Sequence, residues 1–290
     1  MEYKYFQDIL NQQIFESSKP DLIEKIAKYP ERYMGLFRPT KPKAKILQNL
    51  LQSNEIRFGD ALELIFEKYF EEIGFKNLPK KLETENEHLT LDQLFEDSKY
   101  IYFIEQKVRD DHDSTKKRGQ INNFEKKIIA LLEKYDESKL KCYTYFIDPS
   151  LTKNRKYYSD EISKIKNDYK ISVKLCYGKE LWDEIKHPEI WNELLKHLEK
   201  WKKDIPDMPS INFDDDAKST FEEIKAIEVS VFRKLFDNIA VCNEILPVLF
   251  PKNASLILLQ KYFSEKGEQQ SIYKTLSEKI NVYIKARRIA

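Results

Sequence analysis

The stretch Tyr100-Ile-Tyr-Phe-Ile-Glu-Gln-Lys-Val108 constrains the fold more than any other feature, because this hydrophobic run predicts a β-strand. Side chains two residues apart in a strand point to the same face, so Glu105 and Lys107 are expected side by side. A second strand-like run, Leu89–Phe95, contains Asp92, and a polar turn separates the two runs. We therefore predict a hairpin in which Asp92 and Glu105 converge.

Helices and strands alternate from about residue 58 to residue 178. After the hairpin strands, the predicted elements are a helix over 120–135, a strand over 140–147, a helix around 160–165 and a strand over 171–177. A strong amphipathic helix, 60–73, precedes the hairpin. This alternation indicates the α/β class, with helices packed against a sheet.

Both ends of the chain show helical periodicity. The N-terminal region contains a predicted helix over 45–52 after a proline-stiffened basic loop, 38–43. Helical spacing over 179–203 is interrupted near Pro188, and the two prolines within 205–210 mark a linker. We predict a helical N-terminal region (1–57), an α/β domain (58–204) and a helical C-terminal region (211–290).

The composition excludes some classes of protein. A net charge of +1 over 290 residues excludes a generally basic nucleic-acid coat but not local basic patches. Only six glycines are present, and neither GxGxxG nor GxxxxGK[ST] occurs. Cys142, Cys176 and Cys242 are widely spaced in mainly apolar settings, which indicates reduced core thiols in a cytoplasmic protein. No secretory signal and no apolar run of spanning length is found, so we expect no membrane association.

Asp92, Glu105 and Lys107 provide the chemistry that phosphodiester hydrolysis needs. Carboxylate oxygens are suitable ligands for Mg²⁺, which activates water and stabilises charge on a phosphate. Lys107 can orient the attacking water or offset charge on the phosphoryl oxygens. Gln106 points to the opposite face and is expected to be structural.

Asp92 followed by Glu105-Gln106-Lys107 resembles the D…(D/E)xK signature of the PD-(D/E)xK nuclease superfamily, with Leu91 in place of the eponymous proline. Glu63, near the start of the preceding helix, matches the extra acid that these nucleases often carry. Gln120-Ile-Asn-Asn-Phe124 resembles their QxxxY-type element. The segment from Glu105 to Gln120 looks like the active-site region of a type II restriction endonuclease.

The resemblance covers residues 58–178 and implies a restriction-endonuclease-like core, a central mixed β-sheet flanked by helices. It implies Mg²⁺ as the cofactor, with Asp92 and Glu105 as its ligands, and Lys107, Glu63 and Gln120 as further catalytic residues. Other readings stay open. Glu63 can belong to a solvated helix face, and Gln120 can cap or line its helix. Five other acids crowd the region around Asp92, namely Glu83, Glu85, Glu87, Glu96 and Asp97.

Two basic segments are candidate DNA contacts. We expect a polar loop to carry Ser114, Thr115, Lys116, Lys117 and Arg118 toward the phosphate backbone, although a solvated charge run has the same composition. Arg38, Lys41, Lys43 and Lys45 form a second possible phosphate patch. The preceding run, 110–113, resembles a metal cluster of a ββα-metal nuclease, but no companion asparagine and histidine stand at helical spacing.

The C-terminal segments 255–263, 264–267 and 269–283 read as helix, turn and helix. They fit a DNA-reading pair with Gln269, Gln270, Ser271 and Lys274 at the front of a recognition helix. A role in dimerisation or as a lid fits the same pattern.

We expect a type II restriction endonuclease that cuts double-stranded DNA at a short specific sequence. We also expect a homodimer, because a protein with two-fold symmetry matches a DNA site with two-fold symmetry. The resemblance also implies a cognate DNA methyltransferase that protects the host genome. The alternatives are a structure-specific repair or recombination nuclease of the same superfamily, and a non-catalytic DNA-binding protein.

Overall fold

The computed structural model describes residues 1–15, 18–83, 87–110, 112–205, 209–268 and 270–289, and these form two compact units. Unit 1 comprises 1–10 and 59–205, and unit 2 comprises 11–58 and 206–290. Residues 11–58 share a hydrophobic core with the C-terminal helices, because Leu22 and Ile46 pack in one cluster with Leu256 and Ile280.

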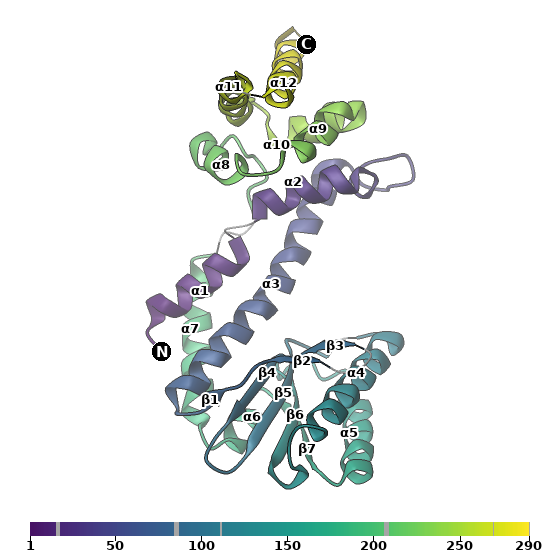
Figure 1. Cartoon of the computed structure of the whole chain (residues 1–290), viewed down its shortest axis with the longest axis vertical. Coiled ribbons are helices and arrows are strands. Elements are labelled where there is room, and N and C mark those ends of the chain that lie inside the picture. Colours follow the sequence, from purple (N-terminus) through teal and green to yellow (C-terminus); the bar gives the residue numbers. More distant parts are fainter. Residues whose placement is uncertain (16–17, 84–86, 111, 206–208, 269, 290) are drawn as a thin grey trace. The chain divides into compact units, whose positions relative to one another are not determined.

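Unit 1 is built on a mixed five-stranded sheet with the strand order β1-β4-β5-β6-β7 (Figure 1). β4 is antiparallel to both β1 and β5, whereas β5, β6 and β7 are parallel. β2 and β3 form a separate antiparallel pair. The strands are β1 (Lys76–Asn77), β2 (Lys81–Glu83), β3 (His88–Thr90), β4 (Gln93–Glu96), β5 (Ile101–Lys107), β6 (Leu140–Phe146) and β7 (Ser172–Tyr177). The predicted mixed α/β core is confirmed.

Helices cover both faces of this sheet. On one face, Phe124 of α4 and Ile162 of α5 share a core cluster with Phe103 of β5. On the other face, Phe70 of α3 stacks on Phe95 of β4 with ring centroids 4.0 Å apart. The helices that contribute to unit 1 are α1 (Tyr3–Phe15), α3 (Pro42–Glu72), α4 (Ser114–Leu132), α5 (Arg155–Tyr169), α6 (Lys179–Glu184) and α7 (Pro188–Lys203), and a 3₁₀ turn spans Glu137–Lys139.

The predicted hairpin is confirmed as β4 and β5, with Gln93 opposite Ile104. Asp97 closes its turn, because its carboxylate accepts hydrogen bonds from the amides of Lys99 (2.7 Å) and Tyr100 (2.6 Å). The hydroxyl of Tyr102 donates a further bond of 2.8 Å. Burial acts to raise the pKa of Asp97, but these hydrogen bonds outweigh it and lower the pKa.

Asp97→Asn is therefore expected to lower the free energy of unfolding by about 1–2 kcal/mol near neutral pH. A carboxyl with a lowered pKa stabilises the fold above its unfolded pKa, about 3.9, and loses that contribution as the pH falls through its folded pKa. The difference between wild type and variant should therefore shrink in acid. Denaturant unfolding at a series of pH values measures it, with Asp8→Asn, which removes an exposed ion pair to Lys4, as the control. A difference independent of pH would contradict this account.

Several predicted boundaries are wrong. The helices predicted over 45–52 and 60–73 are one continuous helix, α3, because the roughly 1 kcal/mol cost of Gly59 in a helix interior is too small to end it. The strand predicted over 89–95 is two strands, with Leu91 and Asp92 between β3 and β4. The helix predicted around 160–165 extends over Arg155–Tyr169 as α5. α4 begins at Ser114, not near Gln120, since Asp113 caps its first turn.

Unit 2 consists of helices around its own apolar core. Parts of α1 and α3 contribute to it. The remaining elements are α2 (Ser18–Lys28), a 3₁₀ turn (Pro30–Arg32), α8 (Ala217–Ile224), α9 (Val229–Asp237), a π turn (Val241–Ile245), α10 (Leu246–Leu249), α11 (Ala254–Gly267) and α12 (Ser271–Ile289). α11 and α12 correspond to the two predicted helices, but the turn predicted over 264–267 is wrong, because these residues continue α11 to Gly267. Gln260 Nε2 of α11 donates to Ser277 Oγ of α12 (2.9 Å). Gln269 lies outside the described residues.

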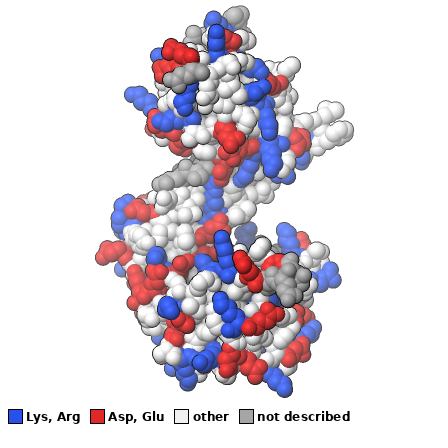
Figure 2. Space-filling view, in the orientation of Figure 1, with Lys and Arg blue, Asp and Glu red and all other residues white. Residues whose placement is uncertain are grey.

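Lys, Arg, Asp and Glu side chains are intermixed on the face shown in Figure 2, as the net charge of +1 leads one to expect. Cys142 and Cys176 are buried, Cys242 is half-buried, and all three are free thiols. Burial raises the pKa of Cys176 to about 12, which keeps this thiol protonated.

Candidate active site

The hairpin places Asp92 and Glu105 next to each other. Asp92 immediately precedes β4, Glu105 lies near the end of β5, and the flanking residues Gln93 and Ile104 are paired. The backbone amide of Gln106 donates a 2.8 Å hydrogen bond to Asp92 Oδ2 and fixes this carboxylate. Asp92 thus uses its side chain to replace a strand contact, which is why strand pairing begins only at Gln93.

Two ammonium groups lie between the two carboxylates. Lys107 Nζ is 3.0 Å from Asp92 Oδ2 and 3.1 Å from Glu105 Oε1. On the other side, Lys127 Nζ is 2.6 Å from Glu105 Oε2 and 3.9 Å from Asp92 Oδ1. The side chains of Glu105 and Lys127 are only 7% and 5% exposed. The four groups form a compact, charge-balanced cluster at the end of β5.

Lys107 is held in its protonated form. Burial alone would lower its pKa, but the negative charges of Glu105 and Asp92 outweigh burial and raise the pKa above its ordinary value. An ammonium group donates hydrogen bonds and carries positive charge, so Lys107 can orient a water molecule or offset charge on a phosphate oxygen.

Glu63 of α3 faces the same cluster. Burial and the negative charge of Asp92 raise the pKa of Glu63 to about 7, although Lys107 and Lys80 oppose the shift. The helix is fixed against β4 because Gln93 Nε2 donates a 2.7 Å bond to the carbonyl of Glu63. A carboxyl group with this pKa changes its protonation state near neutral pH.

Lys127 is the site residue that the sequence analysis missed. It lies on α4, whose buried stripe includes Phe124, Ile128 and Leu131. A lysine within an apolar helical stripe is unusual, since buried lysines are rare unless paired. The helix follows the strand of Glu105, so this position was the available signal in the sequence.

The structure places Gln120 in a different group of side chains. Its Nε2 atom is 3.0 Å from His112 Nε2, and its Oε1 atom accepts a 3.1 Å hydrogen bond from the hydroxyl of Tyr158. Gln120 is seven residues before Lys127, or about 10 Å along the helix axis. Its hydrogen bonds therefore link α4 to α5 and to the loop after β5.

That loop is held by buried hydrogen bonds. Asp110 is fully buried, and its Oδ2 atom accepts bonds from the hydroxyl of Tyr177 (2.5 Å) and the amide of Asn154 (3.2 Å). Asp113 caps α4 by accepting bonds from the amides of residues 115 and 116. Asp111 lies outside the described residues. The structure thus gives the described acids of this run structural contacts.

The predicted basic segments lie in different settings. The start of α4 contains the residues Ser114, Thr115, Lys116, Lys117 and Arg118. The prediction that these residues belong to a polar loop is therefore wrong. Lys117 Nζ lies 4.5 Å from the centroid of the Tyr157 ring and 3.3 Å from Asn154 Oδ1. The second segment is exposed, with Arg38 and Lys41 in the loop before α3 and Lys43 in its first turn.

The donor set fits a hard divalent cation. Carboxylate oxygens of Asp92 and Glu105 converge, and oxygen ligands are those that Mg²⁺ prefers. Among the described residues, no group of three or more His, Cys, Asp and Glu side chains is arranged to hold a metal ion. Mg²⁺ commonly keeps several waters and binds through one or two carboxylates plus substrate phosphate, so two ligands suffice.

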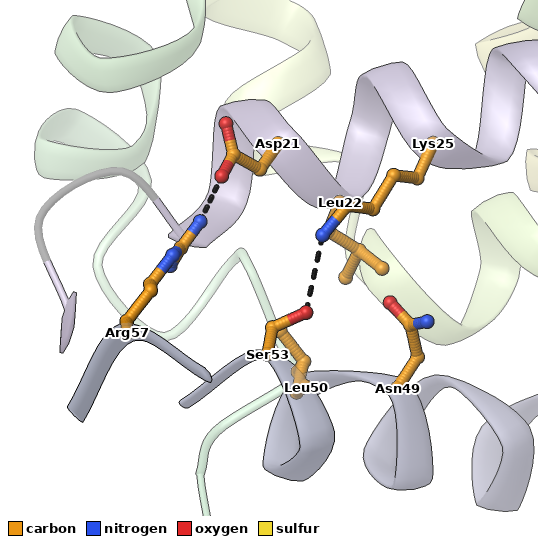
Figure 3. Close-up of a pocket in the computed structure, with 7 residues that line it drawn as sticks. All are labelled: Asp21, Leu22, Lys25, Asn49, Leu50, Ser53 and Arg57. Carbon is orange, nitrogen blue, oxygen red and sulfur yellow. Dashed lines mark hydrogen bonds and ion pairs between the residues drawn. The ribbon is translucent and has the colours of Figure 1, made fainter. Parts of the chain in front are cut away.

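A depression in unit 2 lies between α2 and α3 (Figure 3). Arg57 forms an ion pair with Asp21 across it, and Lys25 Nζ donates a 3.1 Å hydrogen bond to Ser53 Oγ. These two pairs of polar side chains join α2 to α3, so the depression is a contact between two helices of one unit.

Comparison with known proteins identifies the family. The family model described as "Type II restriction endonuclease, HinfI" matches residues 2–83 and 67–202. Neither the curated proteins nor the solved structures gave a match. Among the described residues, no helix has the length and apolar character needed to cross a membrane. The matched segments include most of unit 1 and all four residues of the charge-balanced cluster, namely Asp92, Glu105, Lys107 and Lys127. The chain therefore belongs to the HinfI family of type II restriction endonucleases and is a type II site-specific deoxyribonuclease.

Proposed function

We propose that this enzyme hydrolyses double-stranded DNA at a short specific sequence with Mg²⁺ as its cofactor. The observation that carries the proposal is the convergence of Asp92, Glu105 and Lys107 within about one hydrogen-bond length. Mg²⁺ held there supplies an activated water and charge stabilisation at the phosphate.

Each residue of the cluster has a distinct proposed role. Asp92 and Glu105 hold the metal ion through carboxylate oxygens. Lys107, kept protonated by these acids, donates a hydrogen bond to the attacking water or to a phosphate oxygen. Lys127 orients the buried carboxylate of Glu105. Glu63 supports the site as a nearby acid that accepts or releases a proton near neutral pH.

Gln120 supports the site indirectly in this proposal, because its bonds to His112 and Tyr158 fix α4, the helix that carries Lys127. Two sets of residues contact the DNA backbone. They are Ser114, Thr115, Lys116, Lys117 and Arg118 at the start of α4, and Arg38, Lys41 and Lys43 before and within α3.

The biological setting is proposed from the family. A homodimer fits a two-fold DNA site, because each protomer then cuts one strand. A cognate DNA methyltransferase protects the host genome, and both proteins act in the cytoplasm.

The direct test is digestion of unmethylated plasmid by the purified chain in the presence of Mg²⁺. We expect discrete fragments, and we expect Lys107→Ala to slow cleavage by about a hundredfold to a thousandfold, because it removes a positive charge next to the reacting phosphate. Lys99→Ala is the matched control, since Lys99 is an exposed lysine of the same hairpin. Smears would favour a structure-specific nuclease, and intact plasmid would favour a non-catalytic DNA-binding protein.

A further inference from the structure

Two large apolar side chains stand fully exposed at adjacent positions in unit 2. Leu36 is 93% exposed and Phe37 is 98% exposed, the highest values among the large hydrophobic residues that the structure describes. They lie in the loop between Pro30–Arg32 and α3. In Figure 1 this loop extends away from the helices of its unit, and in Figure 2 the same protrusion is mainly white. Isolated exposed apolar residues are common, but an adjacent fully exposed pair at a tip calls for an explanation.

The local backbone holds this pair outward. Gly35 has a φ of +123°, a conformation that favours glycine, and starts a turn closed by a 3.1 Å hydrogen bond from the amide of Arg38 to the carbonyl of Gly35. Arg38 Nε also donates a 3.3 Å bond to the carbonyl of Glu31. Leu36 and Phe37 are therefore the two central residues of a β-turn.

The base of the loop is anchored in the core. Tyr33 is 1% exposed, and its hydroxyl donates a 3.1 Å hydrogen bond to Asn49 Oδ1 on α3. Met34 next to it is also buried. The loop thus has a buried, hydrogen-bonded base and an exposed tip, the arrangement that an apolar wedge requires.

The sequence on either side of the tip is basic. Between residues 30 and 45 the chain has five basic residues, Arg32, Arg38, Lys41, Lys43 and Lys45, against one acid, Glu31, although the whole chain is nearly neutral. An apolar tip within positive charge complements a ligand with anionic groups outside and flat apolar surfaces inside. Duplex DNA has this arrangement, with phosphates outside and stacked bases within.

We propose that the turn at Leu36 and Phe37, called here the apolar tip, inserts between base pairs of bound DNA while the basic residues beside it contact phosphates. Apolar wedges of Phe or Leu partly unstack a base step and kink the duplex toward the major groove. This inference rests on the proposed function, because it assumes that the enzyme binds duplex DNA.

The test uses duplexes that contain the cleaved sequence, with 2-aminopurine replacing one adenine at a time. Glu105→Gln serves as the parent so that bound DNA stays intact. Binding of the parent should increase 2-aminopurine fluorescence at one step, because the base unstacks there. Phe37→Ala in this parent should remove that increase and weaken DNA binding about tenfold, since stacking on an aromatic ring is worth a factor of this size. Phe37→Trp should retain both properties.

Salt dependence separates the tip from the basic residues. Phe37→Ala should leave the slope of log affinity against log salt unchanged, whereas Lys41→Ala should reduce that slope by about 1. Ile239→Ala is the matched control, because Ile239 is 77% exposed elsewhere in unit 2 and should change neither the fluorescence nor the affinity. Because Phe37, Lys41 and Ile239 are exposed, we expect their replacement by alanine to leave the fold intact, so a change in DNA binding is not caused by unfolding.

The outcomes distinguish this inference from the function on which it rests. If the parent binds DNA and Phe37→Ala changes neither the fluorescence nor the affinity, the inference is overturned while the proposed function stands. If Phe37→Ala instead lowers the molar mass measured by light scattering and leaves the fluorescence change intact, the tip contacts a second copy of the chain, which also overturns it. Absence of any duplex binding by the parent and of cleavage by wild type would overturn both.

Discussion

Replacing Glu105 by glutamine is expected to reduce Mg²⁺-dependent cleavage by at least about a thousandfold while DNA binding largely survives. The substitution keeps the size of the side chain and removes the negative charge of a proposed metal ligand. Binding survives because the contacts to the DNA backbone come from other residues, and because loss of a negative charge does not weaken attraction to phosphate. Plasmid digestion measures cleavage, and fluorescence anisotropy of a labelled duplex measures binding.

Glu96→Gln provides the matched control for this experiment. Glu96 is an acid on β4 of the same hairpin, and it forms an exposed ion pair with Lys76 (2.8 Å). Its replacement should leave cleavage and binding unchanged. Two results would refute the role of Glu105 as a metal ligand. One is an equal loss of binding and cleavage in Glu105→Gln. The other is cleavage by this variant within about tenfold of wild type, which corresponds to a difference of about 1.4 kcal/mol in the activation barrier.

Lys127→Met is expected to have the second large effect, on both stability and cleavage. The buried carboxylate of Glu105 forms ion pairs with Lys107 and Lys127. Without Lys127 it keeps only the 3.1 Å contact to Lys107. We expect the free energy of unfolding without metal to fall by about 2–3 kcal/mol, less than for a buried pair broken outright. Cleavage should slow by about a hundredfold, because a misplaced ligand disturbs the geometry of the reacting groups.

A second readout separates this role from general destabilisation. Mg²⁺ should raise the melting temperature of Lys127→Met more than that of wild type, because the cation replaces the missing positive charge between Asp92 and Glu105. Lys126→Met is the control, since the neighbouring Lys126 is 57% exposed and pairs with Glu87 at the surface, where an ion pair contributes about 0–1 kcal/mol. If Mg²⁺ stabilises both variants and wild type equally, Lys127 does not hold Glu105 for the metal.

The sequence alone predicted the hairpin and the meeting of its charged residues, because strand geometry is local. Alternation along β5 puts Glu105 and Lys107 on one face whatever the rest of the chain does. The turn at Asp97 brings Asp92 back beside them, and the mixed sheet follows from the order of helices and strands. Even here the exact limits of the strands escaped prediction, because the side chain of Asp92 competes for a backbone amide.

Other features of the site depend on packing between distant segments. The pair of Lys127 and Glu105 exists because α4 crosses the face of β5, and hydrophobic periodicity does not specify which residue of a helix meets which residue of a strand. The same holds for Gln120, whose contacts with His112 and Tyr158 join three segments. The raised pKa of Glu63 likewise needs burial beside Asp92, which no sequence pattern expresses.

The amino-acid sequence by itself determined the α/β class, the hairpin and the identity of the acids and the amine at its end, since these follow from residue types and short-range periodicity. Only the tertiary structure decided that a second lysine joins them, that residues 11–58 pack with the C-terminal helices, and that Leu36 and Phe37 project from a turn. The physical reason is that burial and long-range ion pairs depend on how whole elements pack, and this packing free energy is summed over residues far apart in the chain.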